Sequence, residues 1–164
     1  DSLRSACDYA RPQLAKEGIQ LLKQGDDDRF RLLESFKNNT SSVLFATHSF
    51  WEGVDVPGDS LSQVIIVKLP FSVPSDPVFA ARSEDFDKKG KNSFMELSVP
   101  EAVIKFRQGF GRLMRRSSDK GVVVVLDNRI IKKQYGSLFL QSIPETQTLF
   151  SQLLDITKTI TKFI

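Results

Sequence analysis

The stretch that decides the fold is VLFATHSFWEGVDVPGDSLSQVIIV, residues 43–67. It begins and ends with runs of apolar residues, Val43–Ala46 and Val64–Val67, without polar alternation. A third such run follows at Val122–Leu126. Continuous runs of this length are typical of strands covered on both faces, as in a parallel sheet with helices above and below it.

Helical patterns of ten or more residues alternate with these strands, which predicts an α/β fold with a mostly parallel β-sheet and helices on both faces. Near the N-terminus, apolar residues at helical spacing predict a helix over Leu3–Leu14 that Gly18 ends, and Ile19–Leu22 is a strand candidate. The acidic run Asp26–Asp28 is expected to cap a second helix.

Three later segments carry signals for the start of a helix. Asp76-Pro77 predicts an N-cap with proline at the first helical position and a helix to about Phe86. Ser98–Glu101 and Ser142–Glu145 both have the S-x-x-E capping-box pattern. The first predicts a helix to about Arg115. The second predicts a terminal helix with an apolar stripe of Leu149, Leu153, Ile156 and Ile160.

Composition indicates one domain, residues 1–164, because the chain has 164 residues of which 40% are hydrophobic. The chain starts at Asp1, inside a helical pattern, so we expect a fragment of a longer protein. Lys and Arg (23) exceed Asp and Glu (20) by three. The excess is local, since Lys105–Lys133 holds nine basic and two acidic residues.

Cys7 is the only cysteine, which favours a reducing, cytoplasmic location and excludes a zinc ribbon or an iron–sulfur cluster within this chain. No apolar run approaches the ~20 residues of a membrane helix, and no signal-peptide pattern is present. We therefore expect no membrane partner and no metal site.

The predicted helix after Ser98 has two faces. At about 100° per residue, its larger apolar side chains fall together and would face the sheet. Gln108, Gly111, Arg112 and Arg115 share the opposite face. A glycine inside an exposed helix lowers helix stability by about 1 kcal/mol relative to alanine. Gly111 is therefore more easily explained if a ligand must approach the backbone there. Two arginines one turn apart suit a polyanion such as a triphosphate.

These residues carry a family resemblance. Gln108-x-x-Gly111-Arg112-x-x-Arg115 resembles motif VI of superfamily 2 helicases, and Glu52-Gly53-Val54-Asp55 resembles motif V of their DinG/XPD branch. LPFSVPSDP, residues 69–77, resembles the proline-rich loop that joins the two motifs. LDNRIIKKQYG, residues 126–136, resembles the Asp-x-Arg segment that follows motif VI in DinG proteins.

The resemblance implies a RecA-like second motor domain of an ATP-dependent 5′-3′ DNA helicase. Arg112 and Arg115 would reach the ATP phosphates, one as an arginine finger. Gln108 would orient that end of the helix or bond to the nucleotide. Glu52, Gly53 and Asp55 would lie at the ATP site, where Asp55 would accept a ribose hydroxyl or fix an arginine.

Thr47, His48 and Ser49 would contact single-stranded DNA as neutral donors. Trp51 would stack on a base or pack under the loop. The loop is then the second wall of the ATP cleft and couples it to DNA.

The sequence lacks both a G-x-x-x-x-G-K-[ST] loop and an Asp-Glu pair for Mg²⁺, so this chain alone is expected to be inactive. ATP and Mg²⁺ would be bound mainly by an N-terminal RecA-like motor domain, and any iron–sulfur cluster would lie outside this chain. The alternative is a stand-alone nucleic-acid-binding or regulatory RecA-like module without ATPase activity. A DEAD-box-type RNA helicase fits motif VI but fits the other segments less well.

Overall fold

The computed structural model describes residues 2–51, 56, 60–113, 120–152, 155–156 and 160, without the side chains of Ser2 and Trp51. The chain forms two compact units. The first holds the elements from α1 to η1, and the second holds those from β3 to α6.

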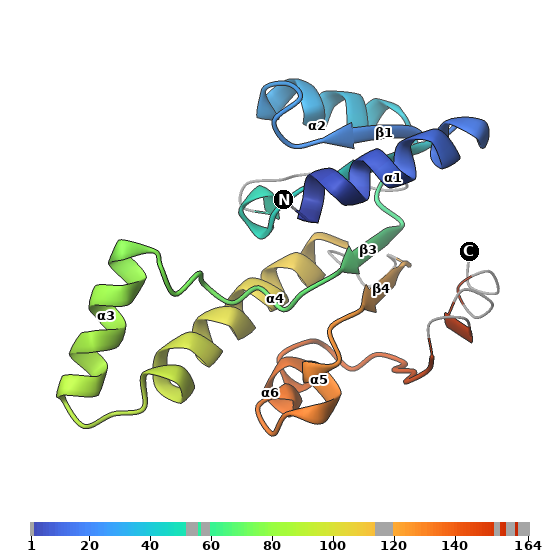
Figure 1. Ribbon diagram of the computed structural model, residues 1–164. Helices are drawn as coiled ribbons and strands as arrows, with labels where there is room; N and C mark the ends of the chain where they lie inside the picture. The colour runs from blue at the N-terminus through green and yellow to red at the C-terminus, as the bar shows by residue number, and fades with distance from the viewer. Residues whose placement is uncertain are drawn as a thin grey trace. The chain divides into compact units, whose positions relative to one another are not determined.

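The first unit is a parallel strand pair with helices on both sides. Its elements are α1 (Ser2–Lys16), β1 (Gln20–Lys23), α2 (Arg29–Asn38), β2 (Ser42–Phe45) and the 3-10 turn η1 (His48–Trp51). β1 pairs with β2 in parallel, with Leu22 opposite Leu44. Figure 1 shows α1 and α2 on opposite sides of β1, and adjacent side chains Leu21 and Leu22, which point to opposite faces, are both buried.

The residues that the sequence singled out set the C-terminal end of α1 and the N-terminal end of α2. Gly18 follows α1 with φ of +70°, a conformation that glycine adopts without strain. The side chain of Asp28 accepts hydrogen bonds from the N–H groups of Phe30 and Arg31, which confirms the acidic cap of α2. The core of this unit then forms where Leu32 and Phe36 of α2 pack with Leu22, Phe50 and Val56.

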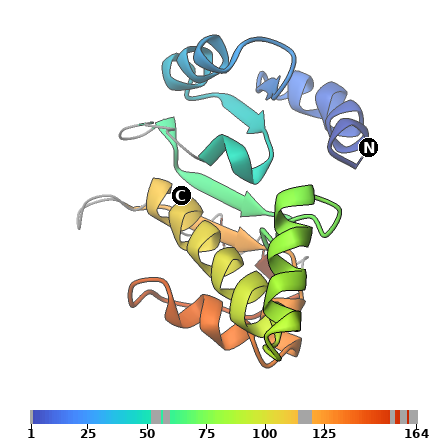
Figure 2. The same ribbon diagram turned by 90° about the vertical axis from the view of Figure 1, so that its left-hand side faces the viewer.

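The second unit is built around a second parallel strand pair. Its elements are β3 (Gln63–Ile66), α3 (Pro77–Lys88), a π-helical turn η3 (Phe94–Ser98), α4 (Val99–Leu113), β4 (Val122–Val125), α5 (Arg129–Lys132) and α6 (Gly136–Gln141). β3 pairs with β4 in parallel, with Ile66 opposite Val125. Figure 2 shows α4 lying across one face of this pair, and α4 also contacts α6.

The two faces of β3 differ in burial. Ile66 is 2% exposed, whereas Ile65, which points to the other face, is 54% exposed, and Val67 just beyond the strand is 63% exposed. The expectation of cover on both faces, made for the runs that begin at Val43, Val64 and Val122, is thus not met at β3 among the described residues, and β2 is half-buried along its length.

Both predicted capping boxes are wrong. Ser98 lies inside a continuous helix that begins after Asn92, whose side chain accepts from Met95 N–H while its own N–H donates to Glu96. A π-helical turn precedes Pro100, and in it Val99 N–H donates to Phe94 O. This turn lets the helix continue through Pro100, which has no backbone N–H to donate.

The second box fails for a different reason. Ser142 Oγ donates to the carbonyl of Phe139, three residues earlier, so this serine closes α6 instead of opening a new helix. Residues 143–152 contain no helix, and Leu149 in the predicted stripe is 61% exposed. Asp155, Ile156 and Ile160 are helical, and Leu153 lies outside the described residues.

Candidate ATP-facing helix and nucleic-acid interface

Helix α4 separates an apolar face from a polar face, as its sequence predicts. Phe106, Phe110 and Leu113 are buried, with Phe106 only 1% exposed. Phe106 packs edge-on against Phe139 of α6, with ring centroids 5.4 Å apart. Because the helix is anchored by this face, the residues of its polar face lie on the side turned away from the core.

The polar face presents Gln108, Gly111 and Arg112. Gln108 and Gly111 are exposed, and Arg112 is half-buried. A Cβ added at Gly111 would meet no atom within 4 Å, so nothing in the described part of the chain requires glycine there. Among the described residues, none therefore occupies the space where a Gly111 side chain would lie. Arg115 lies outside the described residues.

A polar network fixes α4 to its neighbours. Lys105 Nζ donates to Ser72 Oγ at 2.8 Å, and Glu101 accepts from Ser72 and from Arg82 of α3. Ser72 belongs to the proline-rich loop, so this loop positions α4. The sequence did not single out Ser72, Lys105 or Arg82 for this role, since their partners lie 19 to 33 residues away.

The Asp-x-Arg segment locks the ends of the two strands together. Asp127, whose side chain is 8% exposed, accepts from the N–H of Leu69 after β3 at 2.9 Å and from the guanidinium of Arg129. Burial alone would raise the pKa of Asp127, but these hydrogen bonds outweigh it and lower the pKa to about 2. Arg129 also lies over the Phe71 ring, 5.2 Å from its centroid.

Gly136, in the same segment, has a packing role. A Cβ added there would lie 2.1 Å from the carbonyl oxygen of Ile130, so only glycine lets α6 approach α5 this closely. The segment therefore supports the scaffold of the second unit.

The residues predicted to contact DNA lie at the carboxyl end of β2, in the first unit. Thr47 donates from its N–H and its hydroxyl to Gln24 Oε1 at 2.8 and 3.0 Å, and its hydroxyl lies 2.8 Å from Ser49 Oγ. His48 is half-buried, whereas Thr47 and Ser49 are exposed. The structure thus brings Thr47 and Ser49 together. Glu52, Gly53 and Asp55 lie outside the described residues, as does the side chain of Trp51.

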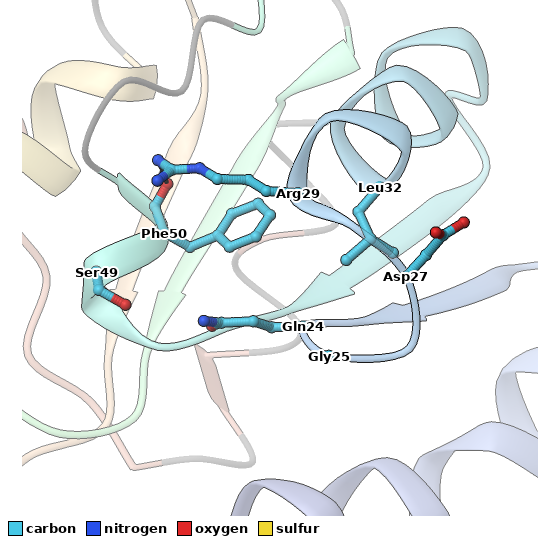
Figure 3. Close-up of a pocket in the computed structure, with 7 residues that line it drawn as sticks. All are labelled: Gln24, Gly25, Asp27, Arg29, Leu32, Ser49 and Phe50. Carbon is cyan, nitrogen blue, oxygen red and sulfur yellow. Dashed lines mark hydrogen bonds between the residues drawn. The ribbon is translucent and has the colours of Figure 1, made fainter.

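A cavity of about 240 Å³ opens beside Ser49. Figure 3 shows its lining residues, Gln24, Gly25, Asp27, Arg29, Leu32, Ser49 and Phe50. Arg29 was not predicted as a site residue because it directly follows the acidic run, which reads as an ordinary helix cap. Its place beside Ser49 depends on the contact between α2 and the end of β2.

No group of three His, Cys, Asp or Glu side chains that could hold a metal ion occurs among the described residues. Within the same residues, no helix is long and apolar enough to cross a membrane.

Comparison with known proteins places these features in a family. A family model described as the helicase C-terminal domain matches residues 1–146. The chain belongs to this family. The predicted resemblance to DinG-type helicases and the predicted α/β fold class are therefore confirmed.

Several curated proteins are similar to this chain over most of its length. The chain is 46% identical over 158 residues to "ATP-dependent DNA helicase YoaA" of Haemophilus influenzae, covering 96% of this chain and 24% of the relative. It is 46% identical over 148 residues to "3'-5' exonuclease DinG" of Bacillus subtilis, covering 89% and 16%. It is 42% identical over 141 residues to "ATP-dependent helicase DinG" of Mycobacterium tuberculosis, covering 86% and 21%. The chain thus spans a quarter or less of the length of these relatives.

Proposed function

We propose that residues 1–164 act as one second motor domain of an ATP-dependent DNA helicase of the DinG type. The polar face of α4 is the observation that carries this proposal. It combines an exposed amide at Gln108, open space at Gly111 and the guanidinium of Arg112 on a helix anchored by its opposite face.

This face suits the phosphates of ATP bound mainly by another motor domain of the same protein. A guanidinium makes planar, bidentate contacts with phosphate oxygens. Arg112 or Arg115 acts as the arginine finger that stabilises charge developing during γ-phosphoryl transfer. Gln108 orients this end of the helix or binds the nucleotide, and Gly111 lets ATP approach the backbone. Mg²⁺ belongs to the other motor domain.

The loop after β2 supplies the remaining contacts. Glu52, Gly53 and Asp55 contribute to the ATP site, whereas Thr47, His48 and Ser49 contact the backbone of single-stranded DNA. Because one short loop holds both sets, it couples the two ligands. The helicase moves 5′ to 3′ along DNA, as in the family that the motifs resemble.

The test uses the full-length protein with Arg112→Ala and Arg115→Ala. An arginine finger contributes about 10³–10⁵ to kcat, so one of these variants should lose at least about a hundredfold in DNA-stimulated ATP hydrolysis. Arg107→Ala is the matched control. Arg107 is an exposed arginine on α4 whose side chain projects about 140° around the helix from Arg112.

Full ATP hydrolysis in both test variants would refute the arginine-finger role. The alternative function is a nucleic-acid-binding or regulatory module without ATPase activity. It stays open because the Bacillus subtilis relative is named an exonuclease and not a helicase. A Walker A loop elsewhere in the same protein favours the motor. Its absence, with no DNA-stimulated ATP hydrolysis, favours the alternative.

A further inference from the structure

We propose that the cavity beside Ser49 binds one backbone phosphate of single-stranded DNA, and that Arg29 is its phosphate-binding residue. This inference rests on the proposed function, because it extends the DNA-contacting loop of Thr47–Ser49 onto helix α2.

Arg29 is held in place but keeps donors for an anion. Its Nη2 donates to the carbonyl of Phe50 at 3.2 Å, and its guanidinium carbon lies 5.3 Å from the centroid of the Phe50 ring. Among the described residues this is its one hydrogen bond, and none of their acids forms an ion pair with it. A guanidinium has five N–H donors, so most remain for a phosphate.

One neutral donor group lines the same cavity. Gln24 accepts from Thr47 through its amide oxygen, which leaves the two N–H groups of Nε2 as donors. The Ser49 hydroxyl donates to Thr47 Oγ1 at 2.8 Å, because the Thr47 hydroxyl hydrogen is already donated to Gln24, so Ser49 does not add a donor for the anion. Figure 3 shows Gln24 and Ser49 close together and the Arg29 guanidinium beyond Phe50, and all three residues line the cavity. One charged and one neutral donor group can together hold the oxygens of a phosphate.

The one acid that lines the cavity does not oppose this assignment. Asp27 Oδ1 accepts from the N–H of Asp28 at 2.8 Å and lies 3.7 Å from Arg31 Nη1. In Figure 3 the Asp27 carboxylate points away from Arg29. Its charge is therefore directed to its own neighbours and not to the space between Arg29 and Ser49.

The size of the cavity decides between a nucleotide and a DNA backbone. At about 240 Å³ it is smaller than the roughly 300–1,000 Å³ of sites that enclose a whole small molecule. Phe50, the aromatic residue of the lining, is only 5% exposed and carries Arg29 on its ring, so no base can stack there. A single phosphodiester of a longer strand fits these limits, and its binding would not depend on base sequence.

The experiment measures binding of a labelled oligothymidylate to the full-length protein over a range of salt concentrations. Arg29→Gln should raise the Kd at least about tenfold, because it removes a charge-assisted hydrogen bond to the phosphate. It should also make the slope of log K against log salt shallower by about 0.7, one phosphate contact on a single strand.

Arg4→Gln is the matched control, because it removes the same charge from an exposed arginine of α1 that has no hydrogen bond or ion pair with the described residues. It should change the Kd by no more than about twofold, since screening weakens attraction over about 8 Å. A melting curve verifies that each variant is folded.

Equal effects of the two variants on DNA binding would overturn the proposal, while the Arg112 and Arg115 results would still stand. A raised KM for ATP with unchanged DNA binding would also overturn it, because the anion would then belong to the nucleotide. If Arg29→Gln fails to fold, Gln24→Ala replaces it. An unchanged Kd in Gln24→Ala would then refute the site, and a Kd raised about threefold or more would support it.

Discussion

Asp127→Asn should reduce the free energy of unfolding of this chain by about 2 kcal/mol at pH 7. The Asp127 carboxylate has an ordinary pKa of 3.8, which the folded structure lowers to about 2. Each tenfold change in acidity is about 1.4 kcal/mol, so the ionised form stabilises the fold by on the order of 2 kcal/mol. The loss stays below the 3–5 kcal/mol of a fully buried pair because the Arg129 side chain is 39% exposed and keeps water contact.

The pH dependence gives the sharper test. Since folding lowers the pKa of Asp127, its contribution is complete above about pH 4 to 5 and is lost as the pH falls towards 2. Roughly half should be lost by pH 3. Urea unfolding followed by circular dichroism at pH 7, 5 and 3 should show wild type and Asp127→Asn converging in acid.

Glu34→Gln on α2 is the control, because this exposed carboxylate has no hydrogen bond or ion pair with the described residues. It should change the free energy of unfolding by less than about 0.5 kcal/mol at every pH. A wild-type advantage over Asp127→Asn that is the same at pH 7 and pH 3 would refute the reasoning.

Two further substitutions test the scaffold by the same urea assay. Gly136→Ala should destabilise by about 1–3 kcal/mol because the methyl group would meet the Ile130 carbonyl, whereas Gly111→Ala, with open space, should stabilise α4 by up to about 1 kcal/mol. A loss of stability in Gly111→Ala would show that the space is not open. Asp28→Ala should cost about 1 kcal/mol by removing the cap of α2, and an unchanged urea midpoint would count against that cap.

The sequence determined the elements whose signals are local. Apolar runs predicted the strands at Val43 and Val122, and helical spacing predicted which face of α4 is buried. Gly18 and Asp28 predicted the helix ends, because a left-handed glycine and an N-cap aspartate act within one turn of the chain. The motifs of the DinG branch similarly lie within short segments, which is why the family resemblance could be stated from the sequence.

Only the tertiary structure decided the contacts between distant segments. Ser98 and Ser142 carry the same local pattern, yet the first lies inside a helix that begins after Asn92 and the second ends α6. The capping-box pattern covers only hydrogen bonds within four residues. It does not determine whether the serine begins the helix that follows or belongs to the helix that precedes it. Likewise, Arg29 lies beside Ser49 because α2 packs on the strand pair, a contact over 20 residues that hydrophobic burial sets and no local spacing encodes.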